Sequence, residues 1–174
     1  MASQLRVDKI VPVDGAPSGG GGGIIKVVQV VKTDTFTVTG TTYTDVTGMS
    51  KSISYTAGHK ILVMFHGHVG MDQADQMANI RLANSSGVIT AATGDAASNR
   101  QRATTTARHH DTSSLTTVNF CYLDSPSGTS ETYKIQMCSA NPSRESYLNR
   151  SGADEDQLYR TRTASTLTLM EISA

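Results

Sequence analysis

Apolar and polar residues alternate in short runs along most of this chain, and that period of two is typical of β-strands. Residues 35–39, 77–83 and 166–172 alternate clearly. Residues 24–31 differ, because they are β-branched and nearly continuously apolar, which predicts a strand buried on both faces. Residues 60–69 are the strongest candidate for a central strand. The chain therefore consists of many strands, and no long amphipathic helix is expected.

Turn-forming residues separate these runs at intervals of about 8–12 residues. Residues 84–87 predict a turn between strand 77–83 and a partner at 88–90, and residues 124–128 predict a hairpin loop between strands 115–123 and 132–138. About eight to ten strands with this spacing predict an all-β fold, an antiparallel β-sandwich of the jelly-roll kind. Val28 and Leu62 are expected in its core, so that an Asp at either position should prevent folding.

The first 23 residues differ from the rest and predict a separate unit. Residues 5–13 alternate like a strand, and a run of glycines then separates them from the strand-rich part. We interpret residues 1–23 as an anchoring arm with a Gly-rich neck, and residues 24–174 as the β-sandwich domain. The alternative is a solvated tail, in which the apolar side chains of the arm would have no use. The residues expected to dock onto a partner are Leu5, Val7, Ile10, Val11, Val13, Gly19, Gly20, Gly21, Gly22 and Gly23.

Composition and charge narrow the functional classes. Lys and Arg number 15 and Asp and Glu number 15, so the formal net charge is zero and no global field attracts nucleic acid or an anionic membrane. No run approaches the roughly 20 apolar residues of a spanning helix. The N-terminus has no signal-peptide pattern, which predicts a protein made in a cytoplasm. We expect no nucleic-acid or membrane partner.

His66 and His68 are the first candidates for chemistry. Residues i and i+2 of a strand point to the same side, so both imidazoles could face one metal ion. The spacing is similar to the His-x-His of cupins, but the Glu of the cupin pattern is missing, since Val69 and Gly70 follow. We therefore expect no metal and no cofactor. A metal-binding, cupin-like enzyme that uses these histidines stays as the alternative from another functional class.

Other polar clusters favour structural roles. Arg100, Arg102 and Arg108 are expected to pair with the carboxylates of residues 154–156, within or between subunits. A freestanding carbohydrate-binding module is a third alternative, but the chain contains no Trp to stack on a sugar. Cys121 and Cys138 lie in apolar runs and are interpreted as buried thiols, with a disulfide between them left open.

Residues 5–29, with the glycine run, resemble the N-terminus of small virion proteins of tailed bacteriophages, notably phages of marine and cyanobacterial hosts. Residues 32–36, 45–49 and 60–63 are similar to the β-domain of the same proteins. The resemblance covers residues 5–69 well and the last strand loosely, and residues 70–164 carry no recognisable motif. It implies a jelly-roll head, a homotrimer about a threefold axis, and an arm docked onto a capsid or tail protein of the particle.

The expected function is therefore structural and not enzymatic, with the protein located in the virion. One form is a tail or head fibre that attaches to a host glycan or receptor, with loops 70–76 and 91–114 as the candidates for the contact. The other is a capsid decoration protein that stabilises the shell. Both forms stay open at this point, and the number of copies per particle decides between them.

Overall fold

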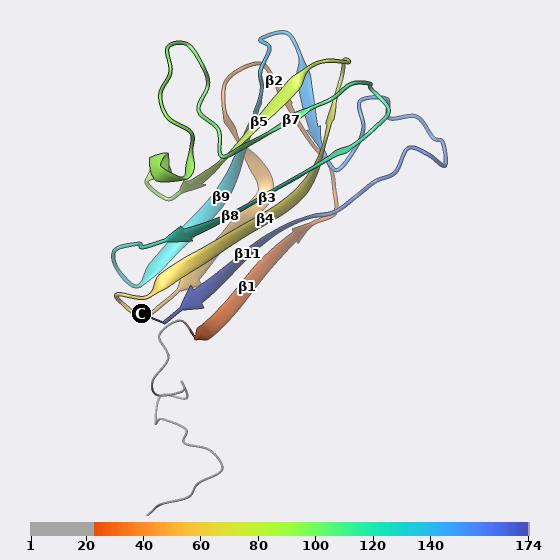
Figure 1. Ribbon diagram of the computed structural model, residues 1–174. Helices are drawn as coiled ribbons and strands as arrows, with labels where there is room; N and C mark the ends of the chain where they lie inside the picture. Colours follow the sequence, from red (N-terminus) through yellow and green to blue (C-terminus); the bar gives the residue numbers. More distant parts are fainter. Residues whose placement is uncertain (1–22, 174) are drawn as a thin grey trace, which may run out of the picture.

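Two antiparallel sheets form the molecule in the computed structural model, which describes residues 23–173 (Figure 1). Sheet A contains β1 (Ile24–Lys32), β11 (Ser165–Ile172), β4 (Lys60–Met71), β10 (Glu145–Leu148), β2 (Phe36–Thr39) and β8 (Thr116–Asp124). Sheet B contains β3 (Thr44–Ser54), β9 (Ser130–Ser139), β5 (Met77–Asn84), β6 (Gly87–Val88) and β7 (Thr105–Arg108). A single 3₁₀ turn, η1 (Thr90–Ala92), completes the elements of the described residues. Within them, no helix has the length and hydropathy that crossing a membrane requires.

The order of the strands is that of a jelly roll. Four strands of sheet A lie in the order β1-β11-β4-β8, and four strands of sheet B lie in the order β3-β9-β5-β7. The chain passes repeatedly from one sheet to the other, so that neighbours in space are distant in sequence. This is the double Greek key of two facing four-stranded sheets. The predicted all-β sandwich is confirmed.

Alternation along β4 and β11 supplies one side of the core between the sheets. In β4 the odd-numbered residues from Ile61 to Val69 point inward and are buried, while Lys60, Met64 and His66 are exposed. The odd-numbered residues of β11 likewise point inward. The largest side chains that fill the core are Tyr133, Phe65, Met49, Ile53, Ile61, Met71, Ile80, Leu82, Ile135, Met137, Leu148 and Leu167.

One predicted hairpin is confirmed and the other is wrong. Gly87 and Val88 pair with Asn84 and Ala83, as the turn at residues 84–87 predicts. The loop after Asp124 exists, but it joins β8 of sheet A to β9 of sheet B, and these two strands are not paired. A turn signal shows where a strand ends, whereas the pairing depends on contacts that are distant in sequence.

Two core assignments also need correction. Within residues 23–173, β1 pairs only with β11 and forms an edge of sheet A, and its outward side chains are exposed, with Val27 at 52% and Val31 at 51%. The predicted burial on both faces is therefore wrong for the part of the chain that the structure describes. Leu62 lies opposite Met170 and Leu123 on the outer side of sheet A, and is only half-buried. Val28 does point inward and packs against the core.

The molecule has two distinct ends. The backbone N–H of Gly23 donates to Ser173 Oγ at 3.0 Å, and the N–H of Ser173 donates to the Gly23 carbonyl at 2.9 Å, so both ends of the described chain lie together (Figure 1). We call this the terminal end. At the opposite end of β4, residues 72–76, 109–115 and 149–164 form the loop end. These loops are joined by backbone hydrogen bonds, from Asp75 to His109 (2.6 Å) and from Ala153 to Thr112 (2.9 Å).

Gly70 explains how the last of these loops fits against β4. A Cβ atom at this position would overlap the backbone of Arg150 and Ser151. We expect Gly70→Ala to lower the free energy of unfolding by about 1–3 kcal/mol, because neither backbone can yield without a shift. Chemical denaturation measures the loss. Gly94→Ala is the matched control, since its Cβ would meet nothing within 4 Å. Equal effects of the two substitutions would show that loop 149–164 is not fixed against β4.

Candidate functional site

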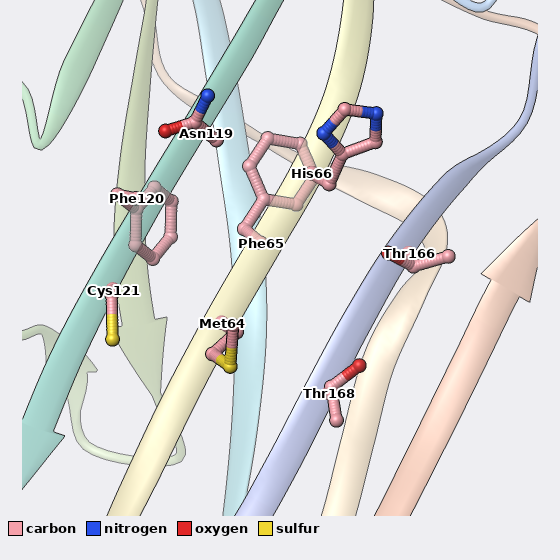
Figure 2. Close-up of a pocket in the computed structure, with 8 residues that line it drawn as sticks. All are labelled: Met64, Phe65, His66, Asn119, Phe120, Cys121, Thr166 and Thr168. Carbon is pink, nitrogen blue, oxygen red and sulfur yellow. The ribbon is translucent and has the colours of Figure 1, made fainter.

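The outer face of sheet A is the candidate site. Its side chains come from four adjacent strands and stand in rows set by the strand register. The apolar row contains Val27, Met170, Leu62 and Leu123. The central row contains Gln29, Thr168, Met64 and Cys121. The histidine row contains Val31, Thr166, His66 and Asn119. We use "outer face" for these three rows, and Figure 2 shows part of the central and histidine rows side by side.

Large apolar side chains are concentrated on and beside this face. Six of those that are exposed in the described residues lie on β1, β4 or β8: Ile24, Ile25, Val27, Val31, Met64 and Leu123. Leu62 and Met170, which are half-buried, add further apolar surface to this face. Covering one half-exposed aliphatic side chain is worth about 1 kcal/mol. The outer face therefore offers a considerable driving force for association, which a solvated sheet face would lack.

The corresponding face of sheet B carries polar side chains that suit contact with water. Asp45 accepts hydrogen bonds from Lys134 Nζ at 2.7 Å and from Gln136 Nε2 at 2.6 Å. Arg81 Nε donates to Gln136 Oε1 at 2.7 Å, and the hydroxyls of Ser52 and Thr132 lie 2.7 Å apart. Polar groups thus satisfy one another across this sheet. The two faces differ in chemistry although both belong to long antiparallel strands. The polar side chains of sheet B suit contact with water, whereas the apolar side chains of sheet A do not.

A shallow hollow of 310 Å³ lies on the outer face (Figure 2). Met64, Cys121 and Thr168 of the central row line it, together with His66 and Asn119. Gln29 Nε2 donates to Thr168 Oγ1 at 2.7 Å, which fixes the polar side of the central row. The hollow is open and lies in the middle of the sheet, so it suits a side chain that reaches in from another surface.

His66 and His68 do lie on the same side of β4, as the alternation predicts. Their ring centroids are 4.9 Å apart and the rings meet edge to face at 87°. Burial, and to a lesser extent the neighbouring His66, lowers the pKa of His68, which favours the neutral form of its ring. Among residues 23–173 no group of three His, Cys, Asp or Glu side chains gathers around a metal position. Within the described residues of one chain, these two histidines are therefore too few ligands to complete a metal site.

Three further titratable groups near the loop end, on His109, Arg108 and Asp154, have structural partners. His109 is buried, and its Nε2 contacts the carbonyl of Val69, which ties loop 109–115 to β4. Arg108 pairs with Asp75 at 3.2 Å. Asp154 pairs with Arg162 at 2.6 Å, so within this chain the predicted pairing of residues 154–156 with Arg108 is wrong. The reason is that loop 149–164 folds on itself and supplies its own cations.

The two cysteines have different environments. Cys138 is buried in sheet B, and burial raises the pKa of its thiol. Cys121 is exposed on the outer face opposite Met64, so the prediction that both thiols are buried is wrong for Cys121. Both are free thiols. They belong to different sheets, which excludes a bridge between neighbouring strands.

The expected docking residues Leu5, Val7, Ile10, Val11, Val13 and Gly19 to Gly22 lie outside the described residues. Gly23 lies inside them, at the terminal end. The outer face itself was missed as a site by reasoning from sequence. Its signal was present in the run at residues 24–31, where a strand of a two-layer sandwich should alternate and does not.

No known protein family matches this chain, and no curated protein does so either. A chain in the structure of infectious bursal disease virus, Gx strain, is similar at 13% sequence identity with a TM-score of 0.40. The similarity covers 100% of this chain and 41% of that one. The present chain thus spans less than half the length of that viral protein.

Proposed function

We propose that this protein is a bacteriophage virion-surface structural protein, a homotrimer and not an enzyme. Its N-terminal arm, residues 1–23, docks onto a capsid or tail protein. The observation that carries the proposal is the polarity of the jelly roll, in which both ends of the described chain meet at the terminal end and the loops gather at the other. A subunit attached at one end and presenting loops at the other needs this arrangement.

The sequence of the arm supports the same assignment. Residues 5–29 resemble the N-terminus of tailed-phage virion proteins, and Gly23 joins the arm to β1 at the terminal end. Loops 72–76 and 109–115 then point away from the attachment. The outer face of sheet A supplies apolar surface for contacts between subunits, as a homo-oligomer requires.

A fibre that attaches to a host glycan or receptor is the first form of this function. Capsid decoration is the second, and the compact head with a single sandwich suits it as well. The number of copies per particle separates them, because a decoration protein covers the whole shell while fibres occupy a few symmetric positions. Imaging the particle with a label on the loop end measures both number and location.

Deleting residues 2–18 tests the proposed anchor. The shortened chain should remain folded and self-associated, because the sandwich starts at Ile24, and it should no longer co-sediment with particles that lack this protein. The matched pair of variants replaces either the apolar residues Leu5, Ile10 and Val13 or the polar residues Arg6, Asp8 and Lys9 with Ser. Only the apolar set should abolish attachment. Attachment of the deleted chain at the full level would refute the anchoring role.

A further inference from the structure

We infer that the outer face of sheet A binds a second copy of this chain, with the apolar row at the centre of the contact. This inference rests on the proposed function, because it assigns a surface to the self-association that the function requires. The contrast between the two sheets carries it. One outer face satisfies its polar groups internally, whereas the other exposes aliphatic side chains from three strands.

Charge points to a copy of the same chain as the occupant. The three rows contain no Asp, Glu, Lys or Arg. Around a threefold axis, the face of each copy can therefore meet the faces of the other two without like-charge repulsion, so that each covers aliphatic groups of its neighbours. Nucleic acid or an anionic membrane would call for cations on this face, and the rows supply none.

The size of the face suits the centre of a specific contact. Four strands spaced at about 4.8 Å and three rows about 6.8 Å apart give roughly 400 Å² in projection. The accessible surface of a corrugated face is larger than its projection, and a standard interface buries about 800 Å² per partner. The rows include β1, an edge strand that pairs with β11 on one side only within the described chain. The contact therefore covers exposed apolar side chains of an edge strand, which natural proteins otherwise protect.

The register also explains where the contact should be tightest. Leu62 stands between Met170 and Leu123, at the middle of the apolar row. Cys121 stands one row away, beside Met64 and at the rim of the hollow. A second copy on the apolar row would therefore cover the Cys121 thiol as well. The thiol is a natural reporter of contact, because Cys138, the other cysteine, is buried in the sandwich.

The experiment compares the mass of the full chain in solution with that of Leu62→Asp by light scattering. The wild type should be a multimer. Leu62→Asp should weaken association by at least about 100-fold and give folded monomers, because an unpaired charge then lies in the centre of the contact. Val88→Asp is the matched control, an exposed aliphatic residue on sheet B, 41% exposed, and it should stay multimeric. Circular dichroism verifies that each variant is folded.

Reaction of Cys121 with a maleimide locates the contact independently. The thiol should react at least about tenfold more slowly in the wild type than in Leu62→Asp, because reagent reaches it only when the subunits separate. Equal rates of Cys121 modification in the wild type and in a Leu62→Asp variant that is still multimeric would overturn this inference. The subunits would then associate through another surface. A monomeric wild type would overturn the proposed trimer as well. If the full chain is a monomer and deletion of residues 2–18 exposes Cys121, the arm and not a second copy covers the outer face. This result would also overturn the inference.

Discussion

Val63→Asp should prevent the chain from folding. Val63 is 0% exposed and lies in the middle of β4, the strand that pairs with β11 on one side and β8 on the other. A carboxylate at this position would be enclosed between the two sheets with no cation or hydrogen-bond donor to compensate it. The cost of a buried unpaired charge is several kcal/mol, which is comparable to the whole stability of a domain, about 5–15 kcal/mol.

The measurement is the yield of soluble protein together with its circular dichroism and thermal transition. Val63→Thr keeps the shape and replaces one methyl group with a hydroxyl, so it should fold with a loss of about 1–3 kcal/mol. Leu62→Asp, one residue away on the outer face, should fold with an unchanged spectrum. If Val63→Asp gave a native transition, the inward assignment of the odd-numbered residues of β4 would be wrong.

The alternation of apolar and polar residues was sufficient to predict the fold class, because a period of two fixes which side of a strand is buried. It placed the strand at residues 60–69 correctly in the centre of a sheet, where β4 has partners on both sides. It could not predict that β8 and β9 separate into different sheets after Asp124. Pairing in a jelly roll is determined by contacts distant in sequence, on which a local pattern carries no information.

The candidate site shows the limit of the same reasoning more clearly. The apolar run at residues 24–31 correctly indicates a strand with two apolar faces, but it does not indicate what covers each face. In the described chain only the core side is covered, and Val27 and Val31 remain exposed. Leu62 was assigned to the core because it lies in an uninterrupted apolar segment, where alternation is hidden. In such segments the register, and with it the outward side, becomes known only from the paired strands.

Glu171 is the clearest conflict between sequence and structure, and it leads to the second large effect. It belongs to the inward, odd-numbered positions of β11, and its side chain is 2% exposed. Its Oε1 accepts hydrogen bonds from the Thr56 backbone N–H at 2.8 Å and from His59 Nδ1 at 2.8 Å. A single buried carboxylate thus fastens the connection between β3 and β4 to the last strand. Burial alone would raise the pKa of Glu171, but the hydrogen bonds from Thr56 and His59 outweigh it and lower the pKa below 4.5.

Glu171→Gln should therefore lower the free energy of unfolding at pH 7 by about 1.5–3 kcal/mol, the value of hydrogen bonds to a charged group. Because the pKa is lower in the folded state, the stabilisation from ionised Glu171 is complete above the unfolded pKa and is lost as pH falls through the folded pKa. Thermal unfolding from pH 7 down to about pH 3 should show the wild type losing stability below about pH 4.5, and the difference from Glu171→Gln narrowing there. Asp95→Asn, in an exposed loop, is the control and should follow the wild type within about 0.5 kcal/mol. A constant difference between wild type and Glu171→Gln across this range would mean that the carboxylate stabilises the molecule by packing and not by its charge.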